Sequence, residues 1–311
     1  MTCKRCHHVV RRSGTYGKRR IQRYRCKVCK ITFSEPAPKL GNHHTDPEIA
    51  AKALAMMLEG MSIRAISRLT DLHEQTITAF MNTAAERARR VLDSKVRNIS
   101  PRFVQMDEMW CFVHTREPHL RDTDPNEWGS TMLWLALDSE TKLIITHRIG
   151  PRNGINAHAF VSDLRARTDG RYQVTSDQYN AYVGAMREHF QQNVEFAQLR
   201  KIYSSGTGDG WYGSGQVVGA VPHVKIGRPD FSRISTSHVE RGNLSVRMHL
   251  RRFTRLTNAF SKTLANLEDA AVLYIGFYNF VRVHQTLKQT PGMAAGLTDH
   301  PWSVAELLGA A

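Results

Sequence analysis

The sequence predicts a mixed α/β (α+β) protein, with a mixed five-stranded sheet and flanking helices preceded by two small modules. Strand-like apolar runs alternate with helical patterns over residues 100–296, a trihelical pattern spans 43–95, and two Cys-x-x-Cys pairs lie within 1–35. Strands that alternate with helices after an initial run of strands indicate a sheet covered by helices. A chain of 311 residues can hold one large core plus small modules.

The first module, residues 1–35, has the cysteine spacing of a zinc ribbon. Cys3 and Cys6 are followed, after a 19-residue gap, by Cys26 and Cys29. Two such turns present four thiolates to one tetrahedral Zn²⁺, and a cytosolic setting disfavours the alternative, a pair of disulfides. We therefore expect one structural zinc ion. The basic residues between the two turns are expected to contact DNA phosphates: Arg11, Arg12, Lys18, Arg19, Arg20 and Arg23.

The second module, residues 43–95, is predicted to be a helix-turn-helix DNA-binding domain. Asp46 and Pro47 form a helix start, and tight connections at 60–62 and 70–72 separate three helical segments. Such connections are typical of a helix-turn-helix, whose recognition helix contacts base edges near its start. We expect that role for Gln75, Thr76 and Thr78. An ordinary helical bundle or a dimerisation hairpin is the alternative.

Residues 100–296 are predicted to form the third domain. The pattern is a strand at 103–113, a hairpin of strands at 131–137 and 142–149, a helix, a strand at 172–176, a helix, and a strand at 194–199. This order is the ribonuclease H-like one. A Gly- and Ser-rich segment at about 203–235 reads as a long insertion, which is either functional or mobile.

Three acidic residues in this domain predict a two-metal site. Asp107 lies within the strand 103–113, Asp177 closes the strand 172–176, and Glu240 opens a helical stretch. Two hard divalent cations bound by carboxylates can clamp the attacking and leaving oxygens of a phosphodiester. Strand alternation puts Asp107 and Glu108 on opposite faces, so the pattern alone does not choose between them. Asp177 has the alternative role of capping the helix that follows.

Charge predicts a nucleic-acid partner. Lys and Arg number 43 against 28 acids, for a net charge of +15, and residues 1–39 contain twelve basic residues and one acid, Glu35. A second acid-free stretch, 241–267, is also rich in arginine. Clustered basic charge is the electrostatic footprint of DNA or RNA, although one such run is often only a solvated surface.

Composition also limits the location of the protein. Its 41% hydrophobic and 23% charged residues are ordinary for a soluble globular chain, and its apolar runs are shorter than the roughly 18 residues that span a bilayer. The basic N-terminus lacks the apolar core of a signal peptide. We expect a cytoplasmic, nucleoid-associated protein with no membrane partner.

Several motifs together resemble the bacterial insertion-sequence transposases of the IS-one family, from Cys3 to about Gly296. They are the paired cysteines, the trihelical segment, and the stretches Asp107-Glu108-Met109-Trp110, Ser176-Asp177-Gln178-Tyr179, His238-Val239-Glu240-Arg241-Gly242-Asn243 and 277–291. The resemblance implies a ribonuclease H-like DDE transposase. In it Asp107, Asp177 and Glu240 would bind two Mg²⁺ ions, for which Mn²⁺ can substitute.

The resemblance also implies the partners and the chemistry. The partners would be double-stranded DNA, as the terminal inverted repeats of the element and as target DNA, and a second copy of the chain in a dimer or higher oligomer. The reaction would be DNA cleavage followed by strand transfer. Arg247, Arg251 and Arg252 would contact DNA, since Arg247 lies seven residues after Glu240 on the same helical face.

Two points remain open in the sequence. Glu240 follows Asp177 by 63 positions, more than the few dozen common in these enzymes, so Glu195, Asp209 and Asp230 are rivals for the third carboxylate. Arg247 favours Glu240. A catalytically inactive zinc-ribbon and helix-turn-helix regulator, derived from a transposase, is the main alternative function. A structure-specific or RNA-directed nuclease on the same fold is a third, which the helix-turn-helix disfavours.

Overall fold

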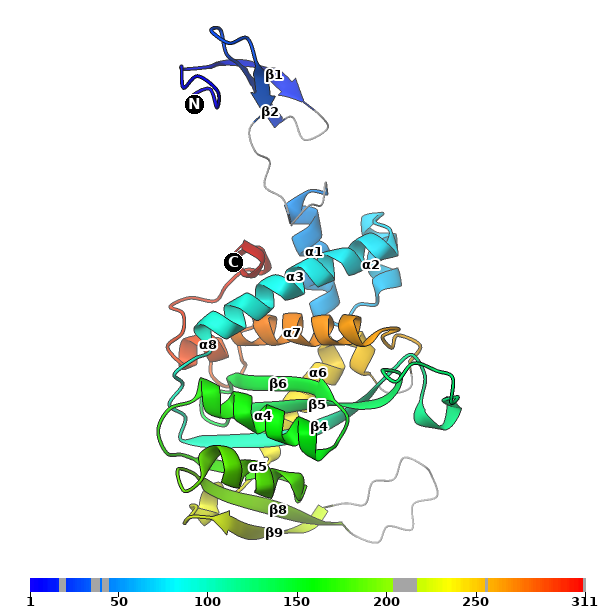
Figure 1. Ribbon diagram of the computed structural model, residues 1–311, viewed down its shortest axis with the longest axis vertical. Helices are drawn as coiled ribbons and strands as arrows, with labels where there is room; N and C mark the ends of the chain where they lie inside the picture. Colours follow the sequence, from blue (N-terminus) through cyan, green and yellow to red (C-terminus); the bar gives the residue numbers. More distant parts are fainter. Residues whose placement is uncertain (17–20, 35–39, 41–44, 204–216, 255–256, 310–311) are drawn as a thin grey trace. The chain divides into compact units, whose positions relative to one another are not determined.

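The computed structural model describes residues 1–309 except 17–20, 35–39, 41–44, 204–216 and 255–256 (Figure 1). The chain forms two compact units, Met1–Pro47 and Glu48–Ala311. The first unit is a three-stranded antiparallel sheet in the order β1-β2-β3, and the second contains a six-stranded mixed sheet with helices. The predicted mixed α/β class is therefore confirmed.

The first unit is small and has little apolar core. Its strands are β1 (Arg11–Tyr16), β2 (Ile21–Arg25) and β3 (Thr32–Ser34). Its core cluster contains Val10 and Tyr24 with Cys3 and Cys26, and the Tyr24 ring stacks on Phe33 at 6.0 Å between centroids. Units below about 40 to 50 residues usually need a metal or disulfides for stability, which makes the four cysteines structurally important.

The three helices predicted between 43 and 95 are present. They are α1 (Pro47–Leu58), α2 (Ile63–Thr70) and α3 (Glu74–Lys95). The Ser62 hydroxyl caps α2 by accepting a hydrogen bond from Ala65 N at 3.2 Å, and Asp71 ends it in the left-handed conformation, at φ 53°. Along α3 a buried stripe through Phe80 and Ala88 packs against α7 (Leu264–Phe280). The three helices thus belong to the same compact unit as the large sheet.

The large sheet has the strand order β6-β5-β4-β7-β8-β9. Its first three members pair antiparallel, β4-β7 and β7-β8 pair parallel, and β8-β9 pair antiparallel. The strands are β4 (Phe103–Val113), β5 (Gly129–Asp138), β6 (Ile144–Gly150), β7 (Gln173–Ser176), β8 (Glu195–Tyr203) and β9 (Val217–Ile226).

The prediction of five strands is wrong, because the described residues form six. The additional strand, β9, lies inside the segment 203–235 that was predicted to be an insertion. Its sequence hides it: β9 is mostly exposed, lacks apolar alternation, and contains Gly219 and Pro222. Proline is tolerated in a sheet mainly on edge strands, and β9 is such an edge, pairing with β8 alone among the described strands.

Helices cover both faces of the large sheet. Figure 1 shows α4 (Gly154–Arg167) and α5 (Ala181–Phe190) in front of it and α6 (Ser237–His249) behind it. Helix α6 contacts β4 and β5, and α4 contacts α5 and β6. The remaining short helices are Glu117–His119, Phe231–Arg233, Arg251–Phe253, α8 (Pro291–Ala294) and α9 (Val304–Gly309). None of the helices in the described part of the chain is long and apolar enough to cross a membrane.

A buried asparagine joins α7 to the outer strand β6. The Asn279 side chain donates to Ile144 O at 2.9 Å and accepts from Ile144 N at 3.0 Å, and Asn279 is fully buried. The amide thus satisfies both backbone groups at the first residue of β6, where a further strand would otherwise have to pair.

Replacing Asn279 by leucine should destabilise the protein strongly. Asn279→Leu leaves the buried N–H and C=O of Ile144 without partners, which we expect to lower the free energy of unfolding by about 3 kcal/mol. Urea unfolding followed by tryptophan fluorescence measures this. Asn126→Leu, at an exposed position, is the matched control. Equal stability of the two variants would contradict the assigned role of Asn279.

Candidate functional site

The pairing of β4 with β7 brings Asp107 and Asp177 together. The two strands run parallel, and the last residue of β7, Ser176, pairs with Met106. Asp177 therefore leaves the sheet next to Asp107, although the two are 70 positions apart. This is the juxtaposition predicted from the sequence.

A third carboxylate, that of Glu108, joins this pair. One oxygen from each of Asp107, Glu108 and Asp177 lies within 4.8 Å of the other two. Asp107 and Glu108 alternate along β4, and both nevertheless contribute an oxygen to this group. Asp177 follows the end of a neighbouring strand, so it is not confined to one face of β4 and both side chains can approach it. We refer to these three residues as the carboxylate centre.

Burial and repulsion from neighbouring acids favour the protonated forms of Asp107 and Glu108 in the carboxylate centre. Burial, followed by the charges of Glu108, Asp177 and Glu240, raises the pKa of Asp107 to about 7. Burial and the charge of Asp177 raise the pKa of Glu108 to about 7 as well. Both effects penalise the ionised forms, so the centre favours anything that supplies positive charge.

Arg152 supplies one such charge. Its Nη2 lies 2.8 Å from Asp177 Oδ2 and its Nε 3.2 Å from Glu108 Oε2. The guanidinium stacks on the ring of Tyr179, with its carbon 4.0 Å from the ring centroid. Asp177 Oδ1 also accepts a hydrogen bond from Tyr179 N at 3.0 Å. Asp177 therefore has two roles: it accepts a hydrogen bond from the backbone at the turn that leads into α5, and it is a member of the carboxylate centre. Sequence reasoning missed Arg152, which follows β6 by two residues and carries no motif.

Helix α6 is attached to β4 at three successive points. The buried Gln105 Oε1 accepts hydrogen bonds from His238 N at 2.8 Å and Val239 N at 3.1 Å, which satisfies the first turn of the helix. Asn243 Nδ2 donates to Asp107 Oδ2 at 2.7 Å. Gln105 and Asp107 share a strand face, so this face of β4 is the one that α6 covers.

The third point is Arg247. Its Nη2 donates to Trp110 O at 3.0 Å and its Nη1 to Phe253 O at 2.8 Å. Its predicted contact with DNA stays a prediction, and the hydrogen bonds show that its guanidinium also ties α6 to β4. Arg252 donates to Ser261 Oγ at 2.9 Å, and burial lowers its pKa to about 10, while Arg251 is exposed.

Glu240 lies near the carboxylate centre without joining it. Its Oε1 accepts from Thr236 Oγ1 at 2.5 Å and forms an ion pair with Lys201 of β8. It stands one turn before Asn243, and its charge still contributes to the raised pKa of Asp107. Sequence reasoning missed Lys201, which no motif marks.

The rival acids are engaged elsewhere or lie outside the described residues. Glu195 pairs with Arg171, at 2.8 Å, and Asp230 accepts from Ser232 N at 2.9 Å. Asp209 belongs to the stretch 204–216, which the structure does not describe. Among the described rivals, none faces the carboxylate centre in place of Glu240.

The carboxylate centre fits divalent cations such as Mg²⁺. Glu108 Oε1 and Asn243 Oδ1 are buried oxygens with no hydrogen-bond partner among the described residues. The Tyr182 hydroxyl lies near enough to Glu108 to lower its pKa but does not reach hydrogen-bonding geometry with it. Unpaired oxygens beside repelling carboxylates are the hard donors that Mg²⁺ and Mn²⁺ prefer.

The four cysteines of the first unit fit a zinc ion. Sγ–Sγ distances are 3.3 Å for Cys3–Cys29, 3.4 Å for Cys6–Cys26 and 3.5 Å for Cys6–Cys29. All four are free thiols, and these separations exceed the roughly 2.05 Å of a disulfide. Four sulfurs so grouped suit a metal with Zn–S bonds of about 2.3 Å. The predicted alternative of two disulfides is therefore disfavoured.

The predicted DNA contacts outside residues 100–296 lie at the surface where the structure describes them. Arg11, Arg12 and Arg23 are exposed on β1 and β2, whereas Lys18, Arg19 and Arg20 lie outside the described residues. In the first turns of α3, Gln75 is exposed and Thr76 and Thr78 are half-buried. Thr78 Oγ1 donates to Glu74 O at 3.0 Å. These placements leave base reading by α3 a prediction.

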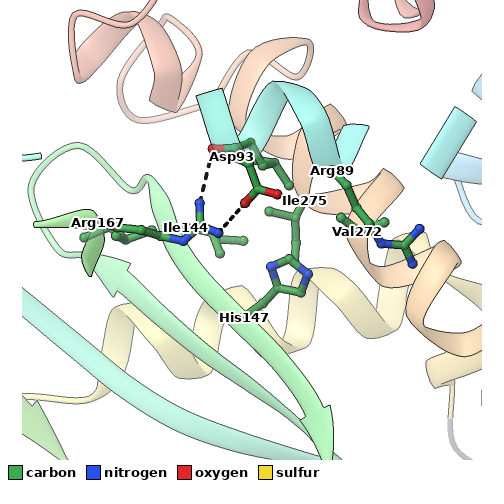
Figure 2. Close-up of a pocket in the computed structure, with 9 residues that line it drawn as sticks. Arg89, Asp93, Ile144, His147, Arg167, Val272 and Ile275 are labelled. Carbon is green, nitrogen blue, oxygen red and sulfur yellow. Dashed lines mark hydrogen bonds and ion pairs between the residues drawn. The ribbon is translucent and has the colours of Figure 1, made fainter. Parts of the chain in front are cut away.

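A cavity of about 170 Å³ lies apart from these residues, between α3, β6 and α7. Figure 2 shows Arg167 and Asp93 meeting across it, with His147 and Arg89 alongside. Arg167 donates to Asp93 Oδ1 at 2.6 Å, Asp163 Oδ2 at 2.7 Å and Leu92 O at 3.2 Å. Because these bonds fix the guanidinium, we assign the cavity a structural role.

Comparison with known proteins gives only remote likenesses. No protein-family model matches the chain. No curated protein matches it. Among solved structures it is similar to the Mos1 strand transfer complex, at 18% identity and a TM-score of 0.22 over 53% of this chain and 59% of that one. It is also similar to a Mos1 transposase paired-end complex with the left transposon end, at 17% identity and a TM-score of 0.23 over 53% of this chain and 60% of that one. A third similar structure is a piggyBac transposase synaptic complex with hairpin DNA, at 9% identity and a TM-score of 0.39 over 88% of this chain and 72% of that one.

This chain thus spans about 60% of the length of the Mos1 chains. The similar structures are those of DNA transposases, but at these identities and scores the likeness carries no argument about chemistry. The function must therefore rest on the residues of this chain.

The raised pKa of Asp107 predicts the pH dependence of stability in Mg²⁺-free buffer. The folded protein holds the Asp107 proton more tightly than the unfolded chain, so stability falls as the pH rises from 3.8 to about 7. The side chain of Asp107→Asn does not ionise, so the variant does not lose this part of the free energy of unfolding as the pH rises. We expect the variant to gain stability over wild type across this range and to keep a constant advantage above it.

Urea unfolding from pH 4 to pH 9 measures the difference, with Asp122→Asn, at an exposed position, as control. Millimolar Mg²⁺ should stabilise wild type and leave Asp107→Asn unaffected. A difference between the two proteins that does not change with pH would contradict the buried, repelled state of Asp107.

The thiolate cluster predicts a zinc requirement for the first unit. Cys3→Ser removes one ligand, and the unit has too small a core to fold well without the metal. We expect about one equivalent of zinc less than wild type, measured by atomic absorption, and faster proteolysis within residues 1–47. Cys111→Ala, at the buried thiol of β4, should keep the full zinc content. Unchanged zinc in Cys3→Ser would rule out the ribbon.

Proposed function

We propose that this protein is a DNA transposase of a bacterial insertion sequence, with a ribonuclease H-like DDE catalytic domain over residues 100–296. The observation that carries the proposal is the carboxylate centre. Asp107, Glu108 and Asp177 meet at the middle of a mixed sheet, where Asp107 and Glu108 have raised pKa values and Glu108 Oε1 is buried without a hydrogen-bond partner among the described residues. Buried like charges of this kind are costly unless cations neutralise them.

In the proposed site, Asp107 and Asp177 would hold two Mg²⁺ ions, with Glu240 completing the set as the family resemblance implies. When bound, such ions activate an attacking oxygen and stabilise the leaving 3′-oxygen of a phosphodiester. Asn243 would fix the orientation of Asp107 through its 2.7 Å hydrogen bond. Lys201 and Arg152 would neutralise Glu240 and Asp177 until DNA and metal arrive.

DNA binding is proposed for the basic modules. The net charge of +15 suits a polyanionic partner, and the exposed Arg11 and Arg12 on β1 would contact phosphates. Helix α3 would enter the major groove of duplex DNA at the terminal inverted repeats. Two element ends must meet for transposition, so we propose that the chain acts as a dimer or higher oligomer, in the cytoplasm on the nucleoid.

The regulator hypothesis is the second candidate, and one observation favours it. Arg152 and Lys201 already pair with Asp177 and Glu240, an arrangement that a protein without catalysis could retain. A regulator would bind element ends without cutting them. Cleavage therefore separates the two hypotheses.

We expect Mg²⁺-dependent nicking and joining of labelled DNA that carries the inverted repeats flanking the gene. Asp107→Ala should lower the rate by more than about 100-fold, because residues that merely support metal ligands already cost 10- to 100-fold. Asp177→Ala should behave alike, and binding of the DNA ends should survive in both. Asp122→Ala, at an exposed position, is the control. If wild type binds the ends but neither nicks nor joins them, the regulator hypothesis is correct.

A further inference from the structure

A second group of metal-ligating side chains lies on the two helices in front of the large sheet and shares no residue with the carboxylate centre. His158 belongs to α4, and Glu188 and His189 are adjacent residues near the end of α5. One ligand atom from each lies within 4.8 Å of the other two. We propose that these three residues bind a transition-metal ion of the zinc class and so cross-link α4 to α5.

The side chains are arranged around one carboxylate. His158 Nδ1 lies 3.0 Å from Glu188 Oε2, and His189 Nε2 lies 3.9 Å from Glu188 Oε1. The two imidazole rings meet edge to face, with centroids 5.7 Å apart. The His158 ring faces α5 at Gly184, one turn before Glu188, where an added Cβ would be in ordinary van der Waals contact with His158 Nε2 at 3.6 Å. The His158 ring can therefore lie close against α5.

His189 provides a second observation. Its Nε2 is buried and has no hydrogen-bond partner among the described residues. A buried polar nitrogen without a partner costs free energy. A metal ion bound between the three side chains would use its lone pair and remove that cost.

The donor set determines the class of ion. Two imidazole nitrogens and one carboxylate form a common three-ligand zinc set, with a fourth position left for water. Imidazole donors favour Zn²⁺, Co²⁺, Ni²⁺ and Cu²⁺ over Mg²⁺. The side chains of His158, Glu188 and His189 are 38%, 62% and 23% exposed, so the ion would exchange with solvent. This chemistry differs from that of the carboxylate centre and of the four cysteines.

The cross-link would steady the surroundings of Asp177. Helix α4 begins at Gly154, two residues after Arg152, and α5 begins at Ala181, two residues after Tyr179. Arg152 and Tyr179 are the residues that hold Asp177. Fixing α4 against α5 would therefore limit how far these two partners can move apart.

Zinc stoichiometry of the full-length protein tests the proposal. Titration against a chromophoric chelator, with millimolar Mg²⁺ present to occupy the carboxylate centre, should give two zinc ions for wild type. His158→Ala and His189→Ala should each bind one. His119→Ala, at an exposed histidine of the Glu117–His119 turn, should bind two. Asp107→Asn should also bind two, which distinguishes this site from the carboxylate centre.

Removing the ribbon isolates the new site. The double variant Cys3→Ser, Cys6→Ser should bind one Co²⁺ with weak visible bands and without the thiolate charge-transfer absorption, and adding His158→Ala should abolish them. Zn²⁺ should raise the thermal midpoint of the double variant only while His158 is present. Circular dichroism of the metal-free variants verifies folding. A single zinc ion in wild type, or two in His158→Ala, would overturn the proposal and leave only a surface contact between histidine and glutamate.

Discussion

Repulsion between carboxylates in the middle of the large sheet is the constraint on which the arrangement of this unit depends. One oxygen from each of Asp107, Glu108 and Asp177 stands within 4.8 Å of the other two, and the Glu108 side chain is buried while that of Asp177 is partly exposed. Two neighbouring segments donate hydrogen bonds to these acids. The Arg152 guanidinium, after β6, contacts Glu108 and Asp177, and Asn243 of α6 donates to Asp107. Such a group is unfavourable in a protein that uses it only for packing, because apolar residues would fill the space at lower cost. Its presence supports a cation-dependent function.

The attachment of α6 to β4 explains why basic residues after Glu240 do not all face outward. Hydrogen bonds to the Gln105 side chain, from Asn243 to Asp107 and from Arg247 to the backbone carbonyl of Trp110 connect the helix to three positions along β4. A helix held this way presents its acidic first turn to the carboxylate centre. Arg247 uses its donors on backbone carbonyls, so a role for it in DNA binding would have to be combined with this internal one. Arg251 is exposed, so its predicted contact with DNA does not have to be combined with an internal role of this kind.

Much of the fold could be predicted because strong local signals agree with it. The apolar runs at β4 and β7 located Asp107 and Asp177, and the Cys-x-x-Cys pairs located the thiolate cluster. The pattern left the choice between Asp107 and Glu108 open, because alternation describes one strand at a time. Both contribute to the centre, since Asp177 follows the end of the neighbouring strand β7. Strand β9 was missed because an exposed edge strand with Pro222 has no apolar pattern to detect. Arg152 and Lys201 could not be found, since contacts between distant side chains leave no local periodicity.

The order in which the centre is assembled has a consequence for biosynthesis. Asn243, which orients Asp107, follows it by 136 residues, and Asp177 lies between them. A nascent chain exposes β4 and its acids well before the helix that covers them has been made. The hydrogen-bonded arrangement around Asp107 cannot form until α6 has been synthesised, so a nascent chain that stops before Asn243 would lack the proposed activity. The topology thereby restricts the proposed activity to chains that already include α6.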